Sequence, residues 1–127
     1  MSVLVINARA VDPKDRRLID LTARVRELVR RARFLQMPVA HLHAAKHGAG
    51  TALYVPIGRY EPVFKANERG RELPSGLIDF IVRSPSKTIH LVGAASQTYL
   101  RYLSQVLTDT GYEARMEAAT VVSFEET

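Results

Sequence analysis

Short apolar runs alternate along the chain with longer segments in which apolar residues recur every three or four positions. The short apolar runs lie at residues 3–7, 39–43, 63–65 and 87–93. They predict buried strands, because a strand covered on both faces is mostly apolar. Helical spacing from Leu18 to Leu35 predicts an amphipathic helix of about five turns, which Pro38 ends. Further helices are predicted after Pro74 and over 96–111, where Gly111 is the stop signal, and a last strand over 112–119.

The predicted order of elements defines the fold class. Strands alternate with helices, which favours a mostly parallel sheet of about five strands with helices on both faces. We therefore expect a three-layer α/β/α domain with Rossmann-like topology. The 127 residues contain no repeat, linker or low-complexity tract, so residues 1–127 are expected to form a single domain.

Composition places the chain among globular proteins and restricts its chemistry. Hydrophobic residues make up 46% of the sequence and the mean hydropathy is −0.08. No apolar run approaches the roughly 20 residues that cross a bilayer, and the first residues lack the features of a secretory signal. There is no cysteine, which excludes disulfides and thiol nucleophiles. We expect a cytoplasmic protein without membrane contact.

The net charge of +5 arises mainly in the first predicted helix and the turn before it. Eight basic residues face three acidic ones there: Lys14, Arg16, Arg17, Arg24, Arg26, Arg30, Arg31 and Arg33 against Asp15, Asp20 and Glu27. A basic helix can follow the phosphates of a nucleic acid. No nucleic-acid recognition motif accompanies it, so a solvated helix face is favoured.

Three short patterns, in this order and spacing, resemble a known family. The first strand ends in "VIN", the third strand lies in "EPVFKAN", and "GAASQTY" follows the strand at 87–93. Together they resemble the isochorismatase-like family of cysteine hydrolases, which includes nicotinamidases. The resemblance covers roughly residues 3–122. Compared with the family, the loop between the second and third strands is short, and a final strand and helix are largely missing.

The resemblance implies a catalytic triad of which one member is retained. In the family a cysteine thiolate attacks a carbonyl group, an aspartate accepts a proton and a lysine fixes the charges. Tyr99 stands at the cysteine position and Asn7 at the aspartate position, whereas Lys65 matches the lysine. A phenol is a weak nucleophile near neutral pH and an amide cannot accept a proton as a carboxylate does. Lys65 is expected to turn to solvent, to Glu61 or Glu68, or to a bound anion.

The backbone before the third helix has two interpretations. The resemblance implies a cis peptide between Ala94 and Ala95 and an oxyanion hole, with free N–H groups after Ser96 available to an anion. The favoured alternative is that Ser96 only caps the helix while the Tyr99 ring fills the vacated pocket.

Three histidines raise the question of a metal. His41 and His43 share one face of the second strand, and His47 follows within a few residues. Nicotinamidases bind a metal in this region, so zinc is a hypothesis. No carboxylate lies nearby in the sequence, and hydrogen-bonded or exposed histidines are favoured. His90, within a strand, is expected to be a satisfied core or interface residue.

The sequence thus predicts a degenerate, non-catalytic isochorismatase-like protein that binds a ligand, regulates or assembles. The partners expected are a small or anionic ligand near Lys65 and further copies of the chain. One alternative is a hydrolase with an altered or metal-assisted site that uses His41, His43, His47 and Lys65. Another is nucleic-acid binding through the arginine-rich helix.

Overall fold

The structure is a computed structural model, which describes residues 1–7, 16–44, 55–66, 73–74 and 76–124. Its elements are β1 (Ser2–Asn7), α1 (Arg16–Phe34), β2 (Val39–Ala44), β3 (Val63–Ala66), α2 (Leu77–Arg83), β4 (Thr88–Ser96), α3 (Gln97–Asp109), β5 (Glu113–Arg115) and β6 (Val121–Phe124). The strands form one sheet in the order β3-β2-β1-β4-β5, and β6 also pairs with β4. Each strand pairing is parallel.

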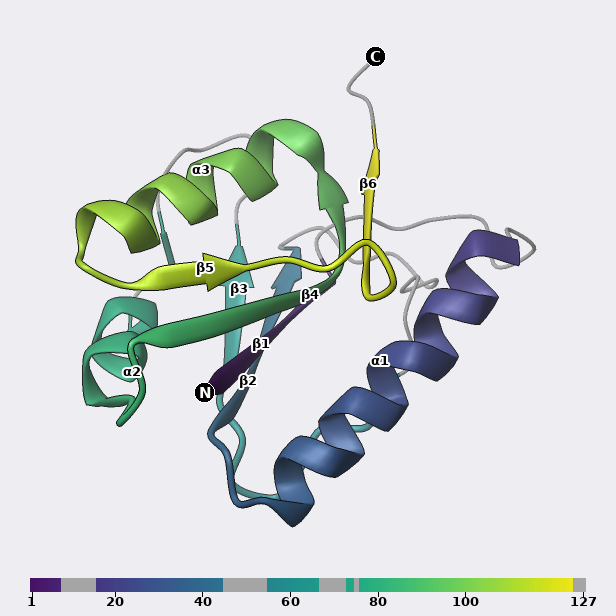
Figure 1. Cartoon of the computed structure of the whole chain (residues 1–127), viewed down its shortest axis with the longest axis horizontal. Coiled ribbons are helices and arrows are strands. Elements are labelled where there is room, and N and C mark those ends of the chain that lie inside the picture. The colour runs from purple at the N-terminus through teal and green to yellow at the C-terminus, as the bar shows by residue number, and fades with distance from the viewer. Residues whose placement is uncertain (8–15, 45–54, 67–72, 75, 125–127) are drawn as a thin grey trace.

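Helices cover both faces of the sheet, as Figure 1 shows, with α1 on one side and α2 and α3 on the other. Strand residues pointing to α1, such as Val3, Val5 and Val92, pack against its buried stripe. Residues of opposite parity, such as Leu4 and Ile6, pack with α2 and α3. This arrangement confirms the predicted three-layer α/β/α fold with a mostly parallel sheet.

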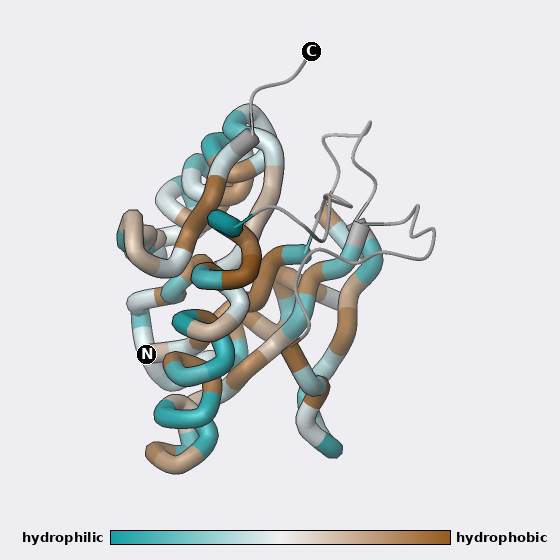
Figure 2. Tube along the Cα trace, turned by 90° about the vertical axis from the view of Figure 1, so that its right-hand side faces the viewer, coloured by the Kyte–Doolittle hydropathy of each residue, from teal (hydrophilic) through white to brown (hydrophobic). Residues whose placement is uncertain are grey.

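The helices form where the apolar spacing predicts them. The stripe of α1 is fully buried and consists of Leu18, Leu21, Val25, Val29 and Ala32. In Figure 2 hydrophobic and hydrophilic residues accordingly alternate along the helical turns. At the end of α3, Gly111 has a φ of +93°, which suits the residue that follows a helix. None of the described helices combines the length and apolar character needed to cross a membrane.

The last strand differs from its prediction over 112–119. β5 ends at Arg115, the chain turns at 118–120, and a further strand, β6, continues the sheet beside the second half of β4. The turn is fixed by two backbone hydrogen bonds, from Thr120 N–H to Glu117 O and from Gly93 N–H to Thr120 O. The sheet therefore has six strands. β6 was not predicted, because its pairing with β4 is a long-range contact that leaves no signature in local apolar spacing.

Candidate functional site

Four residues form one register row across the sheet near its carboxyl edge. Lys65 of β3 is paired with His43 of β2, His43 with Asn7 of β1, and Asn7 with Ala94 of β4. Neighbouring strands lie about 4.8 Å apart and paired residues point to the same face. We call these four residues the edge row. Ligands of open parallel sheets bind beside such carboxyl edges.

The members of the edge row differ in exposure. Asn7 is 4% exposed, His43 is half-buried and Lys65 is exposed. Among the described residues no carboxylate forms an ion pair with Lys65. Lys65 is thus exposed and not paired with Glu61, whereas pairing with Glu68 or with a bound anion stays a prediction. Glu61 contacts other residues, and Glu68 lies outside the described part of the chain.

Tyr99 does not join the edge row. Its ring is 7% exposed and packs in the hydrophobic cluster with residues such as Ile6 and Ala95, on the face covered by α2 and α3. Asn7 has the opposite parity from Ile6 and therefore points to the α1 face. The sheet thus separates the two positions that correspond to the family's nucleophile and base.

The cis peptide implied between Ala94 and Ala95 is a wrong expectation, since no peptide bond among the described residues is cis. The parallel pairing of β4 continues through both residues, opposite Val122 and Ser123 of β6. This ladder keeps the backbone extended, and the trans form is the ordinary one for residues other than proline. Ser96 is the N-cap of α3, because its Oγ accepts a hydrogen bond from the Tyr99 N–H at 3.2 Å.

Glu61 is the site residue that sequence reasoning missed as a partner of His41. Its carboxylate Oε1 accepts hydrogen bonds from His41 Nε2 at 2.8 Å and from the Gly58 N–H at 2.7 Å. Arg33, in the last turn of α1, binds both carboxylate oxygens at 2.7 Å. The contact joins the end of α1 and β2 to the segment before β3, which lies 20 or more residues further along the chain.

Opposing effects act on the pKa of the Glu61 carboxyl. Burial raises the pKa, but the hydrogen bonds from Arg33, His41 and Gly58 outweigh it and lower the pKa to about 2. Glu61 is therefore ionised at neutral pH, and its charge is matched by the Arg33 guanidinium. Because a carboxylate only accepts hydrogen bonds, His41 Nε2 is the protonated nitrogen.

One of the histidines in the zinc hypothesis already has a hydrogen-bond partner within the chain. The rings of His41 and His43 are 6.3 Å apart and edge to face, and His41 uses Nε2 for Glu61. Within the described part of the chain no group of three potential ligands could bind a metal ion. His47, the third candidate, lies outside the described residues.

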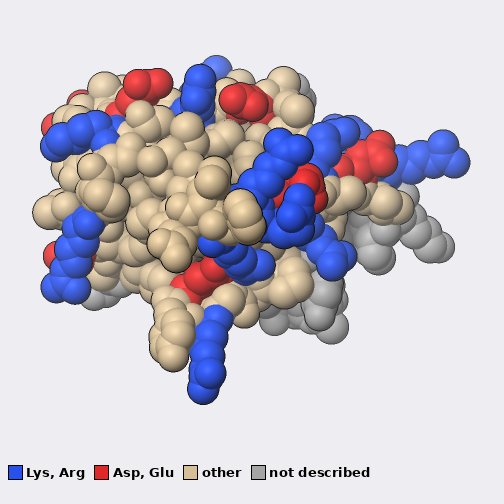
Figure 3. All heavy atoms as spheres, turned by 60° about the horizontal axis from the view of Figure 1, so that its bottom comes forward, with Lys and Arg blue, Asp and Glu red and all other residues tan. Residues whose placement is uncertain are grey.

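Most arginines of α1, with Arg33 as the exception, are exposed, and Lys and Arg side chains gather on one face of the molecule with acidic residues among them (Figure 3). Glu27 pairs with Arg30 at 2.6 Å and with Arg31 at 3.3 Å. Part of the positive charge of this face is thus neutralised within the helix itself. Nucleic-acid binding here stays a prediction.

Comparison with solved structures identifies the fold. An isochorismatase family protein aligns with a TM-score of 0.77 and 13% identity over 98% of this chain and 82% of its own. The nicotinamidase of Staphylococcus aureus aligns with a TM-score of 0.75 and 13% identity over 98% of this chain and 85% of its own. The N-carbamoylsarcosine amidase of Thermoplasma acidophilum aligns with a TM-score of 0.74 and 11% identity over 99% of this chain and 87% of its own. No protein-family model and no curated protein sequence matches the chain. The chain has an isochorismatase-like α/β fold and is structurally similar to hydrolases of that family.

Proposed function

We propose that this chain is a non-catalytic protein of the isochorismatase-like fold whose edge row binds a small anionic ligand. The observation that carries the proposal is the row itself, in which the exposed Lys65 lies in register with His43 and Asn7. The row combines one cation with an imidazole and an amide. That set suits a carboxylate whose remaining part has hydrogen-bonding groups.

The chemistry of the row supports binding without hydrolysis. The sequence contains no cysteine, so a thiolate cannot attack a carbonyl group. Asn7 is a neutral amide and cannot serve as the general base. Tyr99 is buried on the opposite face of the sheet among apolar side chains. Lys65 is available for ligand binding, but the chain has neither the thiol nucleophile nor the carboxylate base that this lysine would assist.

The absence of amide hydrolysis is the first expected result. Purified protein incubated with nicotinamide or N-carbamoylsarcosine, substrates of the amidases with this fold, should release no ammonia above the buffer background. Turnover that Lys65→Ala abolishes and Lys87→Ala preserves would contradict the proposal. Such a result would support the alternative of a hydrolase with an altered site.

Charge selectivity is the second expected result. Nicotinate and nicotinamide have nearly the same shape, but nicotinate is anionic, so it should bind more tightly in an NMR titration of the labelled chain. Lys65→Met should weaken nicotinate binding about tenfold, because it removes the cation and keeps the apolar stem of the side chain. Lys87→Met is the matched control, since Lys87 lies at the other end of the sheet over the Tyr112 ring. Equal binding of nicotinate to both variants would refute the assigned role of Lys65.

A further inference from the structure

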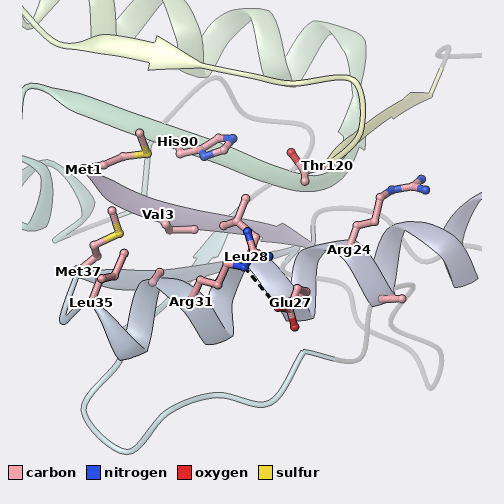
Figure 4. Close-up of a pocket in the computed structure, with 12 residues that line it drawn as sticks. Met1, Val3, Arg24, Glu27, Leu28, Arg31, Leu35, Met37, His90 and Thr120 are labelled. Carbon is pink, nitrogen blue, oxygen red and sulfur yellow. Dashed lines mark hydrogen bonds and ion pairs between the residues drawn. The ribbon is translucent and has the colours of Figure 1, made fainter.

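A groove lies between α1 and the β1–β4 part of the sheet, and we call it the α1–β4 groove (Figure 4). Its volume of about 560 Å³ is within the range of small-molecule sites. The side chains that line it are mostly apolar and include Val3, Leu28, Leu35 and Met37. His90 lies on its sheet side, opposite α1.

The α1–β4 groove is separate from the edge row. Val3 and His90 are paired in register, whereas the edge row crosses β1 and β4 at Asn7 and Ala94. Four residues along a strand correspond to about 13 Å. A ligand in the groove is therefore independent of the function proposed for the edge row.

His90 is the unusual residue of the α1–β4 groove. It is 5% exposed and forms no hydrogen bond with any described residue, and its Nε2 is completely buried. The expectation of a satisfied core histidine is thus wrong, because no described group pairs with the ring, whereas the alternative of an interface residue stays a prediction. Burial lowers the pKa of His90, Glu117 opposes this effect and Arg115 adds to it. The neutral ring has one donor and one acceptor nitrogen.

The charged side chains at the rim already have partners within the chain. Arg31 Nε lies 3.3 Å from Glu27 Oε1, and Arg24 Nε donates a hydrogen bond to the Ala119 carbonyl at 2.5 Å. The rim therefore does not require a charged ligand. The thioether of Met37 is polarizable and adaptable, which suits contact with an aromatic ring.

We propose that the α1–β4 groove binds a small neutral aromatic molecule with one hydroxyl group. The ring packs against Leu28, Leu35 and Met37, and the hydroxyl forms a hydrogen bond with His90 Nδ1, the ring nitrogen that is not completely buried. Burial of the apolar ring supplies most of the affinity. The hydrogen bond selects a phenol over a hydrocarbon of the same shape, by about fivefold for one ordinary hydrogen bond.

The test compares p-cresol with toluene in NMR titrations of the full chain. We expect p-cresol to shift the amide resonances of Val3, Leu28 and His90 and to bind about fivefold more tightly than toluene. His90→Phe should remove that preference while toluene still binds. Ala23→Phe, which places a ring in the groove, should weaken both probes. Gln105→Phe, at a position that is also exposed but lies on α3 at the other face, should weaken neither.

Three results would overturn the proposal. One is that neither probe shifts the groove resonances at millimolar concentration. Another is that His90→Phe leaves the preference for p-cresol unchanged. The third is a dimer in sedimentation that Ala23→Phe dissociates and Gln105→Phe does not, which would make a second copy of the chain the occupant of the groove.

Discussion

Replacing Gly93 with alanine is expected to remove more than about 4 kcal/mol of stability, enough to leave the chain largely unfolded. A Cβ on Gly93 would lie 2.0 Å from the carbonyl oxygen of Ile6, far inside van der Waals contact. The obstacle is backbone of the paired strand β1, so no side-chain rotation relieves it. Gly93 also has a φ of +119°, which other residues rarely adopt. Urea unfolding followed by circular dichroism, with soluble yield as a second readout, measures the loss.

Gly111→Ala is the matched control for the backbone conformation alone. Its φ of +93° is similarly positive, but a Cβ there would meet no atom within 4 Å. We expect a loss of about 1–2 kcal/mol from the left-handed conformation. If Gly93→Ala and Gly111→Ala destabilised the protein equally, the close approach of β4 to β1 at Ile6 would not be the reason for the glycine.

Glu61→Gln is expected to have the second largest effect, a loss of about 2–4 kcal/mol. The Glu61 side chain is 12% exposed and the His41 side chain 1% exposed, so little water can reach the contact to solvate the groups that lose the carboxylate. Arg33 would keep its positive charge without its partner, and the amide NH₂ of glutamine would face donors. For a domain of this size the melting temperature should fall by about 10 °C, which differential scanning calorimetry measures.

The Glu61 contact also predicts that the stability of the folded protein depends on pH in the acid range. The pKa of Glu61 is about 2 in the folded protein, below the ordinary value of 4.5. Folding therefore gains stability from this carboxylate above about pH 4.5, and the gain is lost as the pH falls toward 2. Wild type should lose stability over this interval, and Glu61→Gln should lose less of it.

Glu27→Gln on the outer side of α1 is the matched control. Glu27 also contacts two arginines and has a pKa lowered to about 2, but its side chain is 48% exposed. Water and salt screen such pairs, so no measurable change in melting temperature is expected. Equal effects of the two substitutions would show that burial does not strengthen the Glu61 contact.

Much of the fold could be predicted from local pattern. The α1 stripe and the apolar runs of β1, β2 and β4 lie where the apolar spacing predicts them. Within a single helix or strand, the period of the element fixes which residues share a face and are buried together. β6 could not be predicted in this way. Its residues pair with the second half of β4, and the turn before it depends on a hydrogen bond between Gly93 and Thr120.

The candidate site shows the same division. The ends of β1 and β3 predict that Asn7 and Lys65 lie at one edge of the sheet, since parallel strands bring their carboxyl ends together. The position of Tyr99 on the other face depends on how α3 packs. The Glu61 contact depends on the segment before β3, which meets β2 and the end of α1, and no spacing in the sequence indicates it.

By itself, the sequence determined the three-layer architecture, the lack of a thiol nucleophile and the neutral amide at the end of β1. These properties follow from residue type and from periodicity within single elements. Only the tertiary structure decided that His43 lies between Asn7 and Lys65, that Glu61 binds His41, and that His90 borders a groove without a polar partner. The reason is physical, because register, long-range hydrogen bonds and burial against another element are properties of pairs of segments and appear only when those segments meet.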